Sequence, residues 1–501
     1  MAEQTLGIID IGSNSGRVLV ARVRSAAHLD IVGDARSPLR LVRDVARRGE
    51  LSEETIARTL RTLRGFLAVA NGAGAERTMA VATAAVREAS NGDELIERAR
   101  AELGVSVEIA NGEEEARYGF LGAVHGLPVQ HGIVLDVGGG SLQLIHFRDR
   151  RLQRSWSLKL GALRLSDRFL KSDPPTRGEM RSLKAHVYEI LEAAGVSPLR
   201  ADERLIATGG TVRNLAKVDR RILGDYPISR LHGYVVKRRR LDDVSASLAT
   251  VQAAERGRVP GLNSDRADSI VGGAMVVQSV MDRLLATDLT VAGYGLREGL
   301  ALGSVTREAA SVADVQRAAV AALGERFGAW DARRAEARAV LVGRLLSVLR
   351  PDLSSDAVLA AAFAARLLEV GATIDYYRRE AHTARIIADA NIDGYSHRTL
   401  ALGAAAVQAL GEREASAKGY APVVNAADVP VIEQMAAAIG LADALVRYGS
   451  ADVEQTCPER SNGYVALATS IVDAWPLEAP TRRAERAFGV SFALGDSVRA
   501  T

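Results

Sequence analysis

Residues 8–15 read IIDIGSNS, and residues 134–141 read VLDVGGGS. Each copy is a short apolar run that ends in an Asp and continues into a Gly/Ser-rich turn, and a second apolar run follows it. This pattern predicts a β-hairpin whose tip directs backbone N–H groups and Ser hydroxyls at an anion, with a carboxylate beside it. Because the whole strand–Asp–loop–strand unit occurs twice, we expect two such loops to face each other across a cleft and clamp phosphate.

The course of the chain around the two loops is similar. From residue 1 to about 125, strand and helix patterns alternate, and Ser52 is the predicted N-cap of the first long helix. The second loop opens a comparable course, with a helix near residues 180–194 and a strand after it. Such alternation is typical of α/β layers. We therefore predict two actin-like (ribonuclease H-like) α/β domains, residues 1–125 and 126–305, with an interdomain cleft.

The pattern changes after residue 305. Ser311 is a predicted N-cap, an apolar stripe with helical spacing follows it, and helix succeeds helix to about residue 450. The tail contains short β-like pieces such as residues 464–467. We predict an all-α C-terminal domain over residues 306–501, which includes this small tail region.

Composition limits the classes of function. The chain has 501 residues, 48% hydrophobic and 25% charged, which is ordinary for a soluble protein of two to four domains. Its 64 basic and 61 acidic residues give a net charge of +3, so overall charge does not indicate a nucleic-acid binder. A single cysteine, Cys457, excludes an intrachain disulfide. Without a recognisable leader or an apolar stretch of ~18 residues, we expect a cytoplasmic protein with no stable membrane association.

Several short motifs, in order and with suitable spacing, resemble the exopolyphosphatase/guanosine pentaphosphatase (Ppx/GppA) family in its long form, which carries a helical HD-like C-terminal domain. The matching stretches are residues 10–17, 82–89, 112–117, 136–141, 208–211, 266–270 and 295–299. The resemblance implies hydrolysis of the terminal phosphate of inorganic polyphosphate, and it leaves open the γ-phosphate of guanosine pentaphosphate as a second substrate.

Hydrolysis of a phosphoanhydride needs a held phosphoryl group, neutralised charge and an oriented water molecule. The resemblance assigns phosphate binding to Ser13, Asn14, Arg17, Arg87, Gly138, Gly139, Gly140, Ser141, Gly209, Gly210 and Thr211, and it suggests Arg266 as a further substrate contact. Asp136 and Asp10 would hold Mg²⁺, and whether K⁺ accompanies it is open.

The same resemblance selects Glu115, among the three consecutive glutamates 113–115, as the residue that activates water. At the start of a helix we expect this carboxylate to have a depressed pKa and to stay ionised. The alternative is that the three glutamates only stabilise the first helical turn.

Two departures from the family pattern stand out. The family usually continues the second loop as Gly-Gly-Gly-Ser-Thr-Glu, whereas this chain has Gln143 at the final position. Losing that charge predicts weaker metal binding and reduced turnover. In the C-terminal domain the His-Asp metal pair is replaced by Leu368 and Glu369, and His382 stands nearly alone. We therefore expect this domain to bind no metal and to serve substrate shape, chain-length preference or dimerisation.

Other interpretations stay open at this stage. The basic runs 237–240 and 148–154 either track a polyphosphate chain or form solvated surface. Apolar helices such as residues 401–410 suggest a homodimer, although burial in a core explains them equally well. The rival functions are a sugar-kinase-like phosphotransferase and a non-catalytic sensor of polyphosphate or an alarmone.

Overall fold

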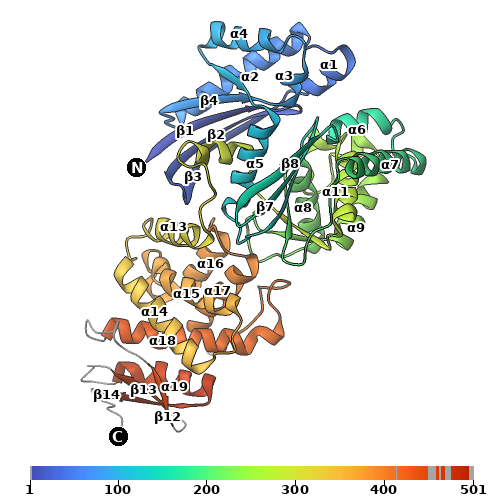
Figure 1. Cartoon of the computed structure of the whole chain (residues 1–501). Helices are drawn as coiled ribbons and strands as arrows, with labels where there is room; N and C mark the ends of the chain where they lie inside the picture. The colour runs from blue at the N-terminus through green and yellow to red at the C-terminus, as the bar shows by residue number, and fades with distance from the viewer. Residues whose placement is uncertain (1–2, 413, 449–457, 462–463, 469–474, 496–501) are drawn as a thin grey trace. The chain divides into compact units, whose positions relative to one another are not determined.

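The computed structural model (Figure 1) describes residues 3–412, 414–448, 458–461, 464–468 and 475–495, so Cys457 and much of the tail lie outside the described residues. The chain divides into two units. Unit 1 comprises Met1–Gly224 and Leu231–Val315, and unit 2 comprises Asp225–Arg230 and Gln316–Thr501. The domain boundaries proposed after residues 125 and 305 stay a prediction.

The first lobe of unit 1 is built on a five-stranded sheet with the order β3-β2-β1-β4-β5. Its strands are β1 (Gln4–Ile11), β2 (Ser15–Ser25), β3 (His28–Pro38), β4 (Arg77–Ala82) and β5 (Val107–Ile109). The first three strands are antiparallel, whereas β4 pairs in parallel with β1. The helices of this lobe are α1 (Leu41–Arg48), α2 (Glu53–Gly72), α3 (Ala84–Glu88) and α4 (Gly92–Leu103). The Ser52 hydroxyl accepts a hydrogen bond from Thr55 N, as its predicted N-cap role requires.

The second lobe repeats this course on a six-stranded sheet with the order β10-β11-β9-β6-β7-β8. Its strands are β6 (Gly132–Val137), β7 (Leu142–Arg148), β8 (Arg151–Leu158), β9 (Arg204–Thr208), β10 (Val235–Lys237) and β11 (Asp288–Val291). Again three antiparallel strands come first, and the next strand, β9, pairs in parallel with β6. The predicted repeat is therefore a repeat of topology as well as of sequence.

The remaining elements of unit 1 are mostly helices. They are α5 (Gly112–His125), α6 (Ala162–Phe169), α7 (Arg177–Ala193), α8 (Gly209–Leu223), α9 (Arg238–Ala249), α10 (Ala253–Arg256), the 3₁₀ turn η1 (Ser264–Arg266), α11 (Ile270–Leu284) and α12 (Leu296–Gly303).

Helix α5 follows the first sheet in the chain but packs on the second, and helix α12 follows the second sheet but packs on the first. Side chains of α5 join the core of the second sheet, while Leu300 and Ala301 of α12 join Leu6 and Ile8 in the core of the first sheet. The two helices pack at backbone distance, since a Cβ placed on Gly122 would lie 1.9 Å from the carbonyl oxygen of Gly295. Glycine is required at this crossing because any side chain would separate the helices.

Unit 2 is largely helical. Its helices are α14 (Ala332–Leu349), α15 (Ser355–Leu367), α16 (Arg379–Asp389), α17 (His397–Leu410), α18 (Val429–Tyr448) and α19 (Glu478–Phe488), and α13 (Val312–Gly324) contains the division between the units. Short 3₁₀ turns are η2 (Val370–Thr373), η3 (Tyr376–Arg378), η4 (Ala426–Asp428) and η6 (Trp475–Leu477). The C-terminal region is largely helical, as predicted, and the tail adds strands to it. Strands β12 (Glu459–Ser461), β13 (Tyr464–Ala468) and β14 (Ser491–Gly495) form a small sheet, in which β13 contains the predicted β-like piece.

One expectation about apolar stretches was wrong. The segment Ala426–Tyr448 has the length and mean hydropathy, 1.5, of a membrane span. Its buried residues, among them Ile432, Met435 and Leu441, belong to the apolar core of unit 2. Helix α17 joins the same core, so burial accounts for the apolar stretch at residues 401–410.

Candidate active site

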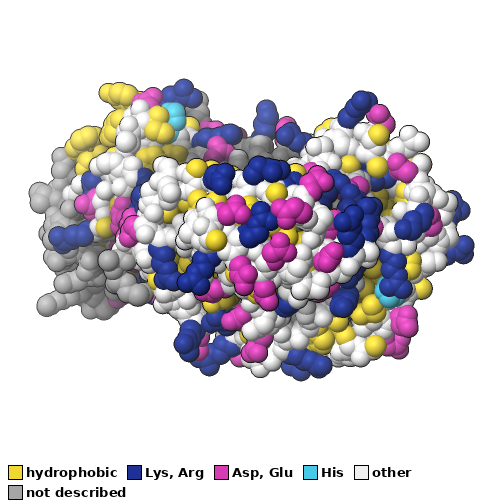
Figure 2. Space-filling model, turned by 90° about the horizontal axis from the view of Figure 1, so that it is seen from above, with side chains coloured by type: hydrophobic (Ala, Val, Ile, Leu, Met, Phe, Trp, Pro, Cys, Tyr) yellow, Lys and Arg dark blue, Asp and Glu magenta, His cyan; other side chains and the backbone are white. Residues whose placement is uncertain are grey.

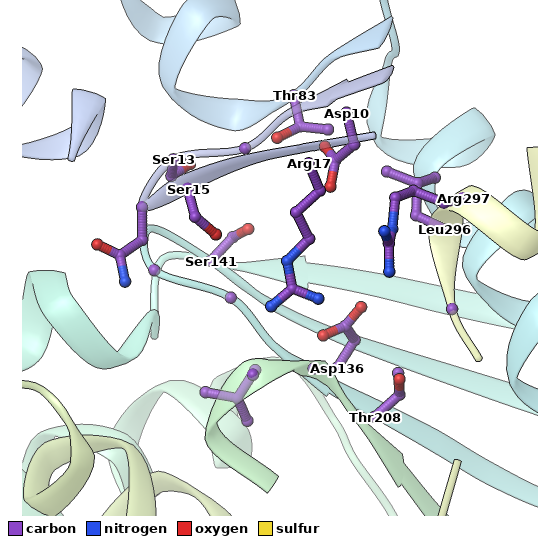
Figure 3. A pocket seen from close by; sticks show the side chains of 18 of the residues that line it. Asp10, Ser13, Ser15, Arg17, Thr83, Asp136, Ser141, Thr208, Leu296 and Arg297 are labelled. Carbon is purple, nitrogen blue, oxygen red and sulfur yellow. The ribbon is translucent and has the colours of Figure 1, made fainter. Parts of the chain in front are cut away.

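The two Gly/Ser-rich loops meet at a pocket in unit 1, with a cavity of about 130 Å³. Figure 3 shows side chains from both loops directed into it, with the Asp10 and Asp136 carboxylates on different strands. The predicted residues that line it are Asp10, Ser13, Asn14, Arg17, Glu115, Asp136, Gly138, Gly139, Ser141, Gly209, Gly210 and Arg266. The sequence motifs therefore come together in space.

The two hairpin tips touch each other beside the pocket. A Cβ placed on Gly139 would lie 2.7 Å from the Cβ of Asn14, and one placed on Gly140 would lie 3.1 Å from the Ser13 Oγ. Glycines in the second loop thus let the first loop approach closely. The facing arrangement expected from the repeated sequence is present, and it leaves hydroxyl groups and backbone N–H groups beside the cavity.

A third loop closes the pocket where β9 passes into α8. Gly209 has φ +90°, and a Cβ on it would lie only 2.5 Å from the Asp136 Oδ1. Gly210 in turn makes room for Arg266, whose Nη2 would lie 2.6 Å from a Cβ there. Both glycines permit charged side chains to lie against the start of a helix, where free N–H groups favour anions.

Four arginines line the pocket: Arg17, Arg213, Arg266 and Arg297. Burial lowers the pKa of Arg17, and the charges of Arg213, Arg297, Arg36 and Arg266 lower it further. The pKa of Arg266 falls to about 10, mainly through burial and then through repulsion by Arg36. Guanidinium groups that are buried together repel one another, so a bound polyanion would relieve an unfavourable interaction.

Acidic side chains share the same pocket. Burial raises the pKa of Asp10 to about 6, although Arg297 and Arg17 oppose the shift. Burial also raises the pKa of Asp136. The buried Oδ1 of Asp10 has no hydrogen-bond partner among the residues that the structure describes. A buried carboxylate without a donor is best satisfied by a cation.

These two carboxylates could hold a divalent cation. Mg²⁺ is commonly held by one or two carboxylates together with substrate phosphates and water. In the described part of the chain, no group of three or more His, Cys, Asp or Glu side chains could hold a metal ion. A metal at Asp10 and Asp136 would therefore depend on phosphate oxygens and water for its remaining ligands.

The three consecutive glutamates have different environments. Asn111 caps α5, and its side chain accepts hydrogen bonds from Glu113 N and Glu114 N. The Glu114 carboxylate in turn accepts a hydrogen bond from Asn111 N at 3.0 Å, which completes a capping box. Glu113 is exposed, whereas the Glu115 side chain is only 15% exposed and lines the pocket. Capping therefore accounts for Glu114, while Glu115 is the glutamate that is available to a ligand.

The depressed pKa expected for Glu115 was wrong. Burial raises its pKa to about 7, Arg87 opposes the shift, and the carboxylates of Asp136 and Asp10 add to it. The favourable effect of a helix N-terminus is small beside the desolvation of a buried carboxylate that has two acidic neighbours. A carboxyl group with a pKa near neutrality can both accept and release a proton.

Three predicted phosphate ligands do not line the pocket: Arg87, Gly140 and Thr211. Arg87 donates to the Ala110 carbonyl and lies 3.5 Å from the Glu115 carboxylate, so it contacts the glutamate instead of the cavity. Gly140 provides the loop contact described above, and its carbonyl accepts from Arg164. Thr211 is buried in α8.

Sequence reasoning missed several lining residues, namely Gly12, Ser15, Thr83, Val137, Thr208, Arg213, Gly295, Leu296, Arg297 and Glu298. The sequence pattern could have indicated the two arginines in this list, Arg213 and Arg297. Arg213 follows Gly209 by one helical turn and therefore shares its face of α8. Arg297 lies in the stretch 295–299, one of the motifs that carry the family resemblance.

Gln143 occupies an informative position. Gln143 lies opposite Asp136 on the neighbouring strand of the second sheet, and Arg17 lies opposite Asp10 in the same way in the first sheet. The Gln143 Nε2 donates to the Ser157 Oγ at 2.9 Å, and its buried Oε1 has no partner among the described residues. It does not line the pocket, so its link to the site is through its neighbour Asp136.

The two basic runs are mostly engaged with the protein itself. In the first run the pairs are Lys237–Asp288, Arg238–Asp242, Arg238–Asp282 and Arg240–Asp219. In the second, Arg148 pairs with Asp202, Arg151 pairs with Glu308, and buried Arg150 donates to four backbone carbonyls. Figure 2 likewise shows a face on which basic and acidic side chains are interspersed. These contacts favour the structural interpretation over a polyphosphate track.

In unit 2, arginines contact the carboxylates of the HD-like stretch. Arg338 is fully buried, and its Nη1 lies 3.1 Å from Glu369 and 3.2 Å from Asp443. Arg447 contacts the same two carboxylates at 3.4 and 2.7 Å. Leu368 is buried beside Glu369. The more exposed Arg334 also contacts Glu369, at 3.6 Å. We call the group formed by Arg338, Arg447, Glu369 and Asp443 the arginine–carboxylate cluster.

The repeated lobes, the facing glycine-rich loops and the arginine-lined pocket together define a two-lobed α/β protein of the phosphate-handling class. The model of the Ppx/GppA phosphatase family matches residues 19–308, more than half of the chain, and the chain belongs to this family. That match ends before α13 begins and does not include the helices of unit 2.

Individual relatives agree with this result. The chain is 33% identical over 319 residues to Exopolyphosphatase 1 of Mycobacterium leprae, which covers 62% of this chain and 92% of that protein. It is 31% identical over 320 residues to Exopolyphosphatase 2 of Mycobacterium tuberculosis, a match that covers 60% of this chain and 99% of that protein. Among solved structures, a Ppx/GppA family member from Aquifex aeolicus has 28% identity and a TM-score of 0.53, covering 61% and 98%. An exopolyphosphatase from Cytophaga hutchinsonii has 25% identity and a TM-score of 0.56, covering 61% and 99%.

Proposed function

We propose that the protein is an exopolyphosphatase that removes the terminal phosphate of inorganic polyphosphate. The observation that carries this proposal is the composition of one pocket. One buried arginine, Arg266, and three half-buried ones line the pocket together with the Asp10 Oδ1, which has no hydrogen-bond partner among the described residues, and with Glu115, whose pKa is about 7. A chain of phosphates would satisfy the arginines, and a divalent cation would satisfy the carboxylate.

In this proposal the loops and arginines hold the terminal phosphoryl group. Ser13, Ser141 and the glycine N–H groups donate to its oxygens, and Arg17, Arg213 and Arg297 neutralise its charge. Asp10 and Asp136 would hold Mg²⁺, which supplies charge neutralisation and polarisation of phosphoryl oxygens when bound. No further metal ligand from the chain is needed, since phosphates and water complete such sites.

Glu115 orients the attacking water and accepts its proton. The new P–O bond forms as the anhydride P–O bond breaks, so the products are orthophosphate and a chain shortened by one phosphate. Arg87, which contacts Glu115 and not the cavity, positions the carboxylate. The raised pKa of Glu115 makes it a stronger base than an exposed glutamate.

The first test is release of phosphate from long-chain polyphosphate, with Mg²⁺ or with EDTA, by the wild type, Glu115→Gln and Glu113→Gln. The Glu113→Gln variant is a matched control because that side chain lies on the same helical turn and is exposed. We expect Glu115→Gln to lower the rate by about 10³-fold, within the range for loss of a general base, and Glu113→Gln to leave it nearly unchanged. Equal rates for both glutamine variants would refute the assignment.

Guanosine pentaphosphate is assayed in parallel, because the pocket recognises phosphate groups and the same chemistry would remove its γ-phosphate. If neither substrate is hydrolysed while polyphosphate still binds, the protein is the non-catalytic sensor that Gln143 favours. Phosphate transfer to an added sugar, without release to water, would identify the phosphotransferase alternative.

A further inference from the structure

A second cavity lies in unit 1, apart from the pocket described above. Helix α11 forms its floor, and α7 and α9, which both pack on α11, form its walls. Figure 1 shows these three helices together on one side of the second sheet. The cavity has a volume of about 920 Å³ and shares no lining residue with the phosphate pocket.

Its floor is apolar. Val271 and Met275 of α11 are each 4% exposed and line the cavity, and Met180 of α7 faces it from one wall. Methionine side chains adapt their shape and pack well against aromatic rings. A flat apolar ligand would therefore find a matching surface here.

Two buried side chains, one on the α9 wall and one on the α11 floor, can form further hydrogen bonds. Ser245 of α9 is 7% exposed, and its hydroxyl has no hydrogen-bond partner among the residues that the structure describes. Gln278 of α11 is also buried, and its Nε2 donates to Asp242 at 2.6 Å, which leaves its Oε1 as an acceptor. A buried hydroxyl without a partner is unfavourable, so a ligand with polar atoms at this wall would gain affinity.

The opposite wall is basic. Arg177, Arg181 and Lys184 line the cavity from α7, where their spacing of four and three residues places them on one face. Within the described part of the chain, Arg177 and Arg181 show no ion pair with an acidic side chain, whereas Lys184 lies near enough to Asp282 to lower the pKa of that carboxyl. Asp242 also lines the cavity, and its carboxylate contacts Arg238 and Gln278. Arg177 and Arg181 can therefore bind an external anion, with the positive charge of Lys184 beside them.

We propose that this cavity binds a mononucleotide. Its base would lie on the methionine floor with its polar edge toward Ser245 and Gln278, and its phosphates would contact the basic face of α7. The volume is within the range of small-molecule sites, and a mostly apolar lining with a few placed polar groups is typical of them. A fatty acid would leave the Ser245 hydroxyl unsatisfied, and inorganic tripolyphosphate would gain nothing from the apolar floor.

The test is direct binding of ATP, GTP, CTP and UTP to the full-length Glu115→Gln protein, measured by titration calorimetry, with tripolyphosphate as the anion without a base. We expect at least one nucleotide to bind more tightly than about 1 mM. Arg181→Glu, at an exposed position, should weaken that binding at least about tenfold, since it removes a charged hydrogen-bonding partner. Arg239→Glu is the matched control, because Arg239 is exposed on α9 and does not line the cavity.

A second variant locates the ligand. Arg17→Met removes an arginine of the phosphate pocket, and the nucleotide should bind this variant as it binds the parent protein. Binding that is lost with Arg17→Met but kept with Arg181→Glu would place the nucleotide in the phosphate pocket and overturn the proposal. Absence of binding for all four nucleotides would overturn it as well. Neither result depends on hydrolysis, so failure here is distinct from failure of the proposed phosphatase activity.

Discussion

The pocket of unit 1 and the arginine–carboxylate cluster of unit 2 contain the same kinds of side chain, but their charges are paired differently. In unit 2, both Arg338 and Arg447 lie within ion-pair distance of Glu369 and Asp443. In unit 1, the largest charge effects on the pKa of Arg17 after burial come from four other arginines, although Arg17 also interacts with the carboxylates of Asp10 and Asp136. The Oδ1 of Asp10 has no hydrogen-bond partner among the described residues.

The difference shows how to distinguish a binding site from a structural ion cluster. Charges that compensate one another within the fold stabilise it and need no ligand. Charges that are gathered with like charges raise the free energy of the empty protein, and a ligand of opposite charge lowers it. The two regions therefore should respond oppositely to removal of one arginine.

The largest effect is expected from Arg338→Ala. This change leaves Glu369 and Asp443 buried with less compensation, so we expect the free energy of unfolding of unit 2 to fall by about 3–5 kcal/mol. Denaturant unfolding followed by circular dichroism measures it. Arg334→Ala is the control, because Arg334 is 47% exposed in its contact with the same Glu369 and should cost less than about 1 kcal/mol. Equal losses of unfolding free energy in both variants would mean that the buried Arg338 stabilises unit 2 no more than the exposed Arg334 does.

Arg17→Met should act in the opposite sense. Removing one of several repelling guanidinium groups should leave the ligand-free protein as stable as the wild type or more stable, while phosphate release falls by about 10²-fold. Thermal melts without phosphate and initial rates with polyphosphate give the two values. Arg22→Met is the control on the same strand, since Arg22 is half-exposed and pairs with Glu3. A large loss of stability in Arg17→Met would contradict the comparison.

The pH dependence separates stability from activity. Asp10 and Glu115 have folded-state pKa values of about 6 and about 7, above their ordinary values of 3.8 and 4.5. Between about pH 4 and 7 the folded state thus binds more protons than the unfolded state, so stability without metal or phosphate should fall as the pH rises. Phosphate release requires ionised Glu115 and should rise about tenfold per pH unit below its pKa. Melts in EDTA and rates in Mg²⁺, both from pH 5 to 8, test the opposite slopes. Melts of Glu115→Gln should show a smaller dependence.

The smallest effect is expected from Gln143→Glu, which adds a carboxylate on the strand position opposite Asp136. We expect half-saturation by Mg²⁺ at a concentration lower by about two- to tenfold, because a nearby negative charge strengthens cation binding at modest distance. Ser157→Ala is a companion variant that removes the Gln143 hydrogen bond without adding charge. Identical Mg²⁺ dependence in the wild type and Gln143→Glu would show that Gln143 does not influence the metal.

The repeated lobes could be predicted from local sequence patterns, and most of the pocket residues from the resemblance to the Ppx/GppA family. An apolar run, an Asp and a glycine-rich turn specify a hairpin wherever they occur, and two copies specify facing loops. The pKa of Glu115 could not be predicted in this way, because burial and two distant carboxylates determine it. Nor could the arginine–carboxylate cluster be predicted, since Arg338 and Asp443 are far apart in the sequence and meet only through packing of α14 and α18.

The exchange of α5 and α12 between the lobes also sets an order for synthesis. Leu6, Ile8 and Leu19 of the first sheet share a core with Leu300 and Ala301 of α12. A ribosome therefore delivers all strands of the first sheet long before the helix that covers this apolar face. Until then the nascent first lobe carries an exposed hydrophobic surface of the kind that chaperones recognise. Truncation before α12 would leave that surface uncovered, so we expect the first lobe not to fold on its own.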